Sequence, residues 1–283
     1  MKIGTKYHLF IIISVLIKAS IASACPASLG YPDVNCDEKF IISFFGDSVT
    51  RGVADPKMNN VTGGVPLRLK KYFKKNLPKK SFKVNNFGRP GIKCLDLKVE
   101  ARREILKNKK GGADSDVAIY ACGLNDYFTH RDSSKTRSYL QAMKRFAKKK
   151  GIFSNIAMVT QTNRPWQQPW VASVNAKLIK VASNIRYDLL DPETMISNDS
   201  LHPNGAGYNF MFDTLFSFIN HTNFIPLAES ELGLTDLDND NVYDIFEITK
   251  FGTDPNNPDT DNDGTKDGKE IFNLRTDPLV ANF

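Results

Sequence analysis

After residue 24 the chain contains no apolar run long enough to form a membrane-spanning helix, which excludes an integral protein built on such helices. It also lacks any recognised nucleic-acid-binding module. Its excess of basic residues, 38 Lys and Arg against 31 Asp and Glu, therefore does not indicate a nucleic-acid partner. Histidine is scarce, with four in 283 residues, so few side chains can act as a general base near neutral pH.

Residues 1–24 have the composition of a secretory leader. Two lysines give a positive start, residues 9–17 form an apolar stretch too short to span a bilayer comfortably, and residues 22–24 form an A-x-A cleavage site. We therefore expect a soluble mature chain that is secreted, periplasmic or held at the cell surface. Because Cys25 comes next, the segment is also a degenerate bacterial lipoprotein signal, and lipidation of Cys25 is the alternative.

The segment Gly46-Asp47-Ser48 directly follows the apolar run of residues 40–45, which we expect to be a buried strand. A serine at the carboxyl end of such a strand is where an α/β sheet presents a nucleophile, although the tripeptide alone could simply cap the next helix. Serine needs an imidazole to accept its proton and a carboxylate to orient that imidazole. Asp199 and His202 could supply both. The other histidines have no carboxylate at a comparable spacing.

Two further segments follow strand candidates between these ends. Gly91 comes after the candidate at 81–86, and Asn125 comes after the candidate at 116–121. The backbone N–H groups of Ser48 and Gly91, with the side-chain amide of Asn125, could hold the oxyanion that forms in acyl transfer. Glycine allows a close approach of the backbone to a ligand. Taken singly, Gly91 could be only a turn and Asn125 only an Asx-turn residue.

In this order the segments resemble the SGNH family of hydrolases, also called the GDSL esterases and lipases, over roughly residues 39–220. The Gly-x-Ser-x-Gly sequence of α/β-hydrolases is absent, which argues against that other fold. The resemblance implies a flavodoxin-like three-layer α/β/α sandwich, with the active site at the carboxyl ends of the parallel strands. It also implies Ser48 as nucleophile, His202 as base, Asp199 as the partner of His202, and Ser48, Gly91 and Asn125 as the oxyanion hole.

The chain alternates strand and helix patterns, which predicts an α/β fold with a parallel sheet covered on both faces. Strand candidates cover residues 39–45, 81–86, 116–121, 153–161 and 185–190, and amphipathic helices cover 64–76, 95–108, 134–150, 170–183 and 206–219. We expect four parts along the chain, namely a signal peptide at 1–24, an N-terminal segment at 25–38, the hydrolase domain at 39–225 and acidic repeats at 232–283.

Four cysteines in an exported chain suit one or two disulfides. Cys25 and Cys36 could close a small loop near the amino terminus. Cys94 and Cys122 each lie three residues from one of the expected oxyanion donors, so they could form a bond if those segments converge, or remain two buried thiols. In a eukaryotic host the sequon at Asn198 could carry a glycan, which would lie next to the expected catalytic carboxylate of Asp199. This conflict favours a bacterial source.

The carboxy-terminal segment is acidic and repetitive. From Glu229 onward it holds 14 of the 31 acidic residues and four of the 38 basic ones, so its net charge is −10 and that of the remainder is +17. The pattern Asp-x-Asp-x-Asp-(Asn or Gly)-x-x-Asp-x-x-Glu begins at Asp236 and again at Asp259, and Thr-Asp-Pro follows each copy. This is the ligand spacing of a calcium-binding EF-hand loop.

These repeats resemble the thrombospondin type 3 repeats of exported bacterial proteins, with Asn241 in the place of the turn glycine in the first copy. We expect the repeats to bind calcium with a structural role and none in catalysis, because nothing in the sequence places them near Ser48. A disordered acidic linker is the alternative. The expected calcium ligands, two of them through their carbonyl groups, are Asp236, Asp238, Asp240, Val242, Asp244, Glu247, Asp259, Asp261, Asp263, Thr265, Asp267 and Glu270.

The substrate is less closely indicated. Lysine clusters, for example at 70–75 and 148–150, could attract an anionic lipid or polysaccharide surface, or could be solvated helix faces. Trp166 and Trp170 could flank a lipid-binding cleft, stack on sugar rings or anchor a loop. We therefore expect an exported serine hydrolase acting on a lipid or phospholipid acyl ester or on a carbohydrate acetyl ester. A calcium-dependent surface adhesin with a non-catalytic hydrolase-like domain is the alternative from another class.

Overall fold

The structure is a computed structural model. It describes residues 39–57, 63–77, 82–106, 115–129, 132–178, 184–219, 233, 235–274 and 276–282. The expected leader, the first two cysteines and two of the histidines outside the leader, His130 and His221, lie outside the described residues. None of the described helices is both long and apolar enough to cross a bilayer.

Four parallel strands form the central sheet in the order β2-β1-β3-β4. They span Phe40–Gly46 (β1), Phe82–Gly88 (β2), Val117–Ala121 (β3) and Phe153–Ile156 (β4). Every residue of β1 is buried, because this strand has a neighbour on each side and helices on both faces. Its sequence, apolar from Phe40 to Phe45 except for Ser43, is typical of such a strand.

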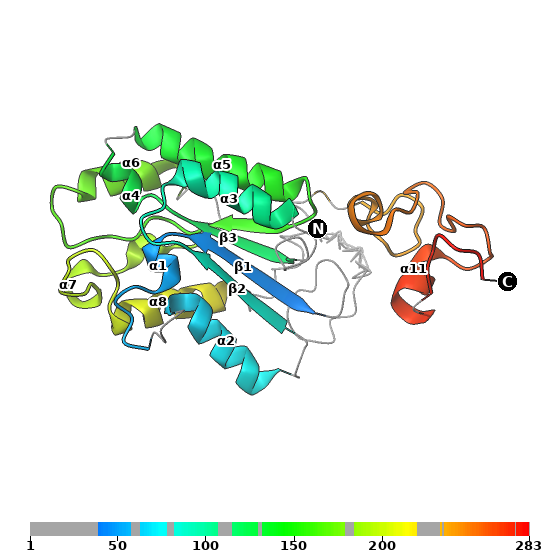
Figure 1. The fold of residues 1–283 in the computed structure, drawn as a ribbon, viewed down its shortest axis with the longest axis horizontal. Coiled ribbons are helices and arrows are strands. Elements are labelled where there is room, and N and C mark those ends of the chain that lie inside the picture. Colours follow the sequence, from blue (N-terminus) through cyan, green and yellow to red (C-terminus); the bar gives the residue numbers. More distant parts are fainter. Residues whose placement is uncertain are drawn as a thin grey trace, which may run out of the picture.

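Helices cover both faces of the sheet, which gives the three layers seen in Figure 1. The helices α3 (Cys94–Leu106), α5 (Ser133–Lys148) and α6 (Gln168–Leu178) lie together on one face. The helices α2 (Gly64–Asn76) and α8 (Gly205–Ile219) lie on the other. These are the five helices expected from the sequence, and the ends that the structure describes differ from the expected ones by at most two residues. Residues 107–108 and 179–183 of two expected helices lie outside the described residues. The expected α/β fold is confirmed.

The expected strand at 185–190 is wrong beyond its first residue. Ile185 makes a single parallel bridge with Ala157, and a short 3₁₀ helix, Tyr187–Leu189, follows. The N–H of Tyr187 donates to the carbonyl of Ile185 at 2.9 Å, and the N–H of Leu190 donates to the carbonyl of Tyr187 at 3.3 Å. Because these turn bonds engage the main chain locally, the segment cannot continue a strand ladder.

The expected strand at 153–161 is also shorter than predicted, since β4 ends at Ile156. Beyond it, the side chain of Asn175 on α6 replaces a neighbouring strand. Its Oδ1 accepts from the N–H of Val159 at 3.0 Å, and its Nδ2 donates to the carbonyl of the same residue at 2.8 Å. A buried side-chain amide can satisfy one donor and one acceptor of an extended backbone in this way.

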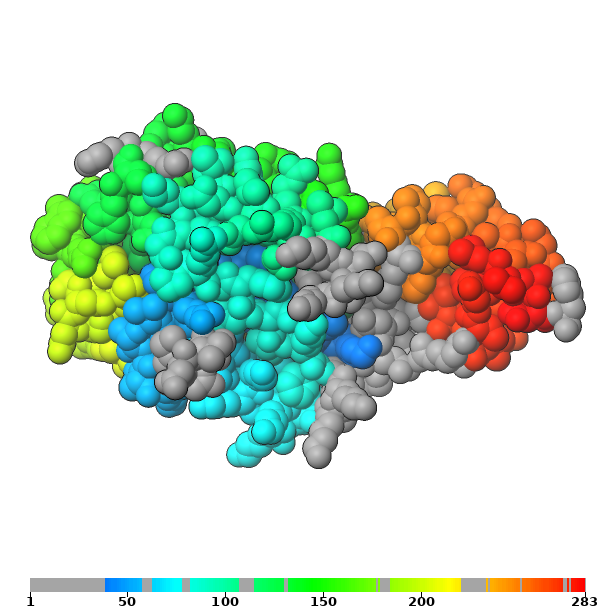
Figure 2. All heavy atoms as spheres, in the orientation of Figure 1, coloured from blue at the N-terminus to red at the C-terminus, as the bar shows by residue number. Residues whose placement is uncertain are grey.

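The acidic repeats form a lobe at one end of the molecule (Figures 1 and 2). Each repeat is a loop followed by a short helix that loosens into a π-helical turn. The first has α10 (Asp244–Phe246) and the turn Glu247–Phe251, and the second has α11 (Asp267–Lys269) and the turn Glu270–Leu274. Phe246 packs on the body, because a Cβ added to Gly151, just before β4, would lie only 2.4 Å from the Phe246 ring.

Candidate active site and acidic repeats

Three polar side chains meet at the carboxyl end of β1. Ser48 is the first residue of α1 (Ser48–Arg51), two positions after the strand ends. His202 Nε2 lies 2.8 Å from Ser48 Oγ, and His202 Nδ1 lies 2.6 Å from Asp199 Oδ2. With a proton on Nδ1 donated to the carboxylate, Nε2 is left to accept the serine hydroxyl. The arrangement is that of a nucleophile, a base and an orienting carboxylate.

The turn that carries Asp199 and His202 is held by the side chain of Asp199 itself. Its Oδ1 accepts from the N–H groups of Leu201 and His202 and from the hydroxyl of Ser197, each at 2.8 Å. Partial burial alone would raise the pKa of Asp199, but the hydrogen bonds from the His202 ring and from these three groups outweigh it and hold the pKa well below its ordinary value. The carboxylate therefore stays ionised beside the imidazole.

A second loop braces this turn from outside. The guanidinium of Arg164 donates from Nη2 to the carbonyl of Asp199 at 3.0 Å, and the N–H of Asn163 donates to the carbonyl of Ser200 at 3.0 Å. Ser200 has a positive φ of 61°, which a non-glycine residue adopts only where its surroundings stabilise it. Sequence reasoning missed Arg164 because its contact lies 35 residues away along the chain and carries no motif.

The glycine before the nucleophile is required by packing. A Cβ on Gly46 would lie 1.9 Å from Thr50 Oγ1 and 2.5 Å from the carbonyl of Ala121. The next residue, Asp47, caps α1 by accepting from the N–H of Val49 at 2.9 Å. Burial raises the pKa of Asp47 to about 6, with attraction to His202 opposing the rise and repulsion from Asp126 adding to it. Asp47 therefore interacts electrostatically with His202, which the sequence did not indicate.

The two expected oxyanion segments follow the strands on either side of β1. Gly46 lies opposite Gly88 of β2 and Ala121 of β3 in the sheet register. Gly91 has a φ of 77°, a conformation that favours glycine, and a Cβ there would meet no atom within 4 Å, so the space beside it is open.

Two bonds tie the Gly91 and Asn125 segments together. Asn125, in α4 (Leu124–Tyr127), donates from its side-chain Nδ2 to the carbonyl of Ile92 at 3.0 Å. Cys94 and Cys122 form a disulfide with their Cα atoms 5.5 Å apart. The sequence was compatible with either this disulfide or two buried free thiols, and the structure contains the disulfide. The two segments expected to supply oxyanion donors therefore lie side by side at the same edge of the sheet as Ser48.

Aromatic side chains lie near the segments that carry Asn125 and Arg164. Trp166 is 64% exposed and Phe128 is 50% exposed, with the Arg164 guanidinium 5.8 Å from the Phe128 ring centre. Trp170 differs, because it is partly buried and packs edge-on against Tyr127 with ring centres 6.0 Å apart. The sequence did not distinguish the two tryptophans, whereas in the structure Trp166 is the more exposed of the two.

An open pocket of about 490 Å³ adjoins the Gly91 loop. Its walls come from this loop and from the exposed side of α3, and Arg89 and Glu100 form an ion pair across it. Charged and apolar groups share the lining, which includes Asp96, Val99 and Arg103. The pocket is therefore open to solvent and mixed in character next to one of the expected oxyanion donors.

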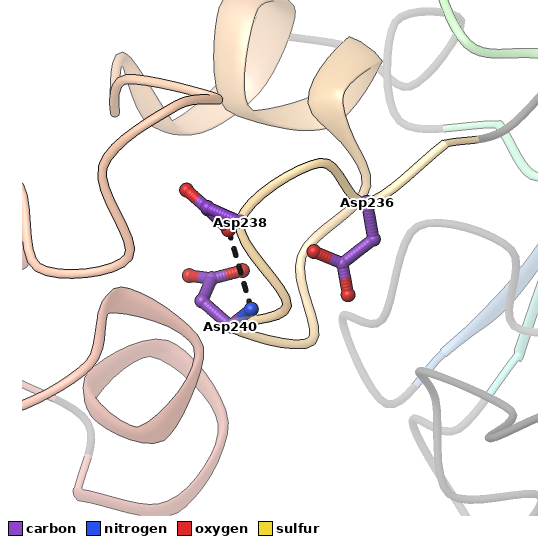
Figure 3. A group of neighbouring side chains, drawn as sticks. All are labelled: Asp236, Asp238 and Asp240. Carbon is purple, nitrogen blue, oxygen red and sulfur yellow. Dashed lines mark hydrogen bonds between the residues drawn. The ribbon is translucent and has the colours of Figure 1, made fainter.

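The repeats bring carboxylates together in three clusters. One consists of Asp236, Asp238 and Asp240, which all come from a single loop in Figure 3. Its counterpart in the second repeat consists of Asp259, Asp261 and Asp263, and the third joins Asp240, Glu247 and Asp267. Each loop turns through a residue with positive φ, Asn241 at 78° and Gly264 at 91°. The clusters could hold a metal ion.

Several carboxylate oxygens of the two repeats are buried without a hydrogen-bond partner among the described residues. They are Asp236 Oδ1, Asp238 Oδ2, Glu247 Oε2, Asp261 Oδ2 and Glu270 Oε2. Burial raises the pKa of Asp240 to about 6 and that of Glu247 to about 7. Buried carboxylates with unsatisfied oxygens are costly unless a cation compensates them. The donor set, all of it oxygen, fits a hard divalent cation such as calcium.

Comparison with known proteins identifies the family. The sequence profile of the GDSL-like Lipase/Acylhydrolase family matches residues 44–210, more than half of the chain. The chain therefore belongs to this family of carboxylic ester hydrolases, as the sequence motifs predicted. The profile match does not extend to the acidic repeats, and no curated protein sequence matches the chain.

The chain is similar to several solved structures, and the first of those that follow shows the same fold. The lipase/acylhydrolase from Enterococcus faecalis is 20% identical, with a TM-score of 0.50 over 64% of this chain and 95% of that one. A member of the lipolytic protein G-D-S-L family from Veillonella parvula is 20% identical, with a TM-score of 0.48 over 63% and 97%. A carbohydrate esterase family 3 protein from Talaromyces cellulolyticus is 13% identical, with a TM-score of 0.48 over 69% and 98%.

Proposed function

We propose that the chain is an exported serine esterase in which Ser48, His202 and Asp199 form the catalytic triad. The observation that carries this proposal is the continuous pair of short contacts, 2.8 Å from Ser48 Oγ to His202 Nε2 and 2.6 Å from His202 Nδ1 to Asp199. Ser48 Oγ attacks the ester carbonyl as its proton passes to Nε2. The imidazolium then protonates the leaving alcohol. In the second half of the reaction His202 accepts a proton from water, the water attacks the acyl-enzyme, and Ser48 regains its proton as the acid is released.

The oxyanion of each tetrahedral intermediate is held by the N–H groups of Ser48 and Gly91 and by the amide of Asn125. One amide hydrogen of Asn125 is engaged by the carbonyl of Ile92, and the second is the one assigned to the oxyanion. Removing one such donor typically costs about 3–4 kcal/mol of transition-state stabilisation. The bond to Ile92 also fixes the direction in which the second hydrogen points.

The substrate is a carboxylic ester that contacts Trp166 next to the triad loop. An exposed indole can stack on a sugar ring or lie against an acyl chain, so it serves either of the two ester classes expected from the sequence. A series of esters with increasing acyl length separates them. Activity confined to acetyl esters and lowered by Trp166→Ala assigns a carbohydrate ester, and activity that rises with chain length assigns a lipid. Trp170→Ala is unsuitable as the test, because that ring packs inside the loop.

The acidic repeats bind calcium in this proposal, and the ions stabilise the lobe without entering the reaction. The support is the set of buried carboxylate oxygens that lack partners in both repeats. The leader-like residues 1–24 support export, and calcium is abundant outside the cell. Mass spectrometry of the mature amino terminus tests the cleavage site and distinguishes a free from a lipidated Cys25.

Covalent labelling tests the triad. A fluorophosphonate should label the parent chain on Ser48, and labelling should be lost in Ser48→Ala and strongly reduced in His202→Ala. Ser138→Ala is the matched control, since Ser138 is an exposed serine on α5 and its removal should change neither labelling nor ester hydrolysis. Full hydrolysis of a short chromogenic ester by Ser48→Ala would refute the proposed mechanism.

A further inference from the structure

The two repeats use their ninth-position aspartates in the same local way. The carboxylate of Asp244 accepts from the N–H of Leu237 at 2.9 Å and from the hydroxyl of Thr235. The carboxylate of Asp267 accepts from the N–H of Thr260 at 2.9 Å and from the hydroxyl of the same residue at 2.6 Å. Each aspartate thus bonds the main chain seven residues earlier and closes its own loop.

The two aspartates differ in what else lies near them. Asp267 is fully buried, and one of its oxygens lies within 4.8 Å of a carboxylate oxygen of Asp240 and one of Glu247, both in the first repeat. Asp244 is only partly buried and belongs to none of the acidic clusters among the described residues. The equivalence of the two repeats therefore breaks at this position.

The second repeat is seated directly on the first at this cluster. The N–H of Gly268 donates to Asp240 Oδ2 at 2.9 Å, and a Cβ on Gly268 would lie only 2.2 Å from the carbonyl oxygen of Asp240. Lys266 Nζ donates to the carbonyl of Asn239 at 3.0 Å. The start of α11 therefore lies against the loop of the first repeat and carries Asp267 with it.

One buried oxygen of this cluster indicates that the cluster binds a ligand. Glu247 is fully buried, and its Oε2 has no hydrogen-bond partner among the described residues. Calcium binds oxygens at about 2.3–2.6 Å, so ligands on opposite sides of one ion are up to roughly 5 Å apart. Three carboxylate oxygens all within 4.8 Å of one another can therefore ligate a single ion. Without a cation, three buried carboxylates at such distances would repel one another.

We propose that Asp267 of the second repeat ligates the calcium ion of the first repeat, together with Asp240 and Glu247, and that Asp244 does not ligate it. This inference rests on the proposed calcium binding and changes the assignment of its ligands. The first site is incomplete until the second repeat is folded against it. Calcium affinity in the first loop consequently depends on the second repeat, and the two repeats bind ions as a coupled pair.

Terbium luminescence can report on the first loop alone. Tyr243 lies next to Val242, the expected carbonyl ligand, whereas the second repeat has Lys266 at the matching position. Terbium, an ion of similar size and ligand preference to calcium, is titrated into the calcium-free full chain while tyrosine is excited. Tyr243→Phe should abolish the sensitised signal and thereby verify its origin.

Asp267→Asn and Asp244→Asn form the matched pair for the test. Both substitutions keep an acceptor oxygen for the loop-closing N–H and remove one charge. We expect Asp267→Asn to weaken terbium binding at the first loop about tenfold or more, and Asp244→Asn to weaken it much less. An unchanged affinity in Asp267→Asn, or an equal or larger loss in Asp244→Asn, would overturn the inference.

A third variant separates ligation from folding of the second repeat. Asp259→Asn removes a carboxylate from the second loop without altering the shared cluster. If Asp267 is a ligand, Asp267→Asn weakens the first site more than Asp259→Asn does. Equal losses would assign the effect to folding of the second repeat and would refute ligation by Asp267. Absence of any terbium or calcium uptake by the parent chain would instead refute the proposed calcium binding itself.

Discussion

Replacing Asp199 by asparagine isolates the electrostatic role of this residue from its structural one. In the present geometry Oδ1 accepts three hydrogen bonds that hold the turn, and Oδ2 faces His202 Nδ1 at 2.6 Å. An asparagine can keep its oxygen toward the turn, which places its NH₂ group toward Nδ1. The NH₂ group then donates to Nδ1, so the imidazole carries its proton on Nε2 and can no longer accept one from Ser48.

The expected magnitude follows from this change of tautomer. A wrong tautomer in a serine–histidine–carboxylate triad lowers kcat by about 10⁴-fold, which corresponds to about 5 kcal/mol of barrier. KM and the melting temperature should change little, because the turn and the oxyanion segments are retained. Asp199→Ala should lose a similar factor in kcat and also lower the melting temperature, since it removes the three bonds to Oδ1.

Steady-state kinetics on a short chromogenic ester, with differential scanning calorimetry of the same samples, provide the measurement. Fluorophosphonate labelling should slow in parallel with kcat, because both need the serine proton to be accepted. A value of kcat for Asp199→Asn within tenfold of the parent would refute the argument. It would mean that the 2.6 Å contact does not set the protonation state of the imidazole.

Two further predictions concern stability. Burial raises the pKa of Asp47 from 3.8 to about 6, so the folded chain favours its protonated form. The unfolding free energy of the parent should therefore fall by up to about 3 kcal/mol, relative to Asp47→Asn, as the pH rises from about 4 to 7. Parallel denaturation curves of the two chains across this range would contradict it. The Cys94–Cys122 bond closes a 28-residue separation, and Cys94→Ser/Cys122→Ser should cost about 3–4 kcal/mol of unfolding free energy. An unchanged denaturation midpoint would show that the bond does not constrain the unfolded chain.

Much of the site was predictable because its parts follow strands that the sequence marks clearly. The run at 40–45 is apolar except for Ser43, and the carboxyl ends of parallel strands lie at one edge of a sheet. Segments that follow adjacent strands therefore meet there, which is why Ser48, Gly91 and Asn125 could be grouped without a structure. His202 and Asp199 were recognisable because their spacing of three lets one short turn hold both.

The features that escaped prediction depend on contacts between distant residues or on local bonding that composition does not reveal. Arg164 braces Asp199 across 35 residues, and nothing near Arg164 in the sequence indicates that partner. Ile185 begins a segment in which apolar and charged residues alternate, as in a strand, but main-chain turn bonds end the strand at once. The two repeats look equivalent in sequence, and only their packing distinguishes the surroundings of Asp267 from those of Asp244.

The position of the acidic lobe determines what calcium can influence. Gly151 precedes β4 and contacts Phe246 of the first repeat, whereas Ser48 follows the carboxyl end of β1. Because all four strands are parallel, these points lie at opposite ends of the sheet (Figure 1). An ion bound near Glu247 would be separated from Ser48 by the length of the strands, so we expect it to affect the proposed reaction only through the stability of the fold. Phe246 lies at the junction of lobe and body, so we expect ordering of the repeat to stabilise the hydrolase domain through this contact.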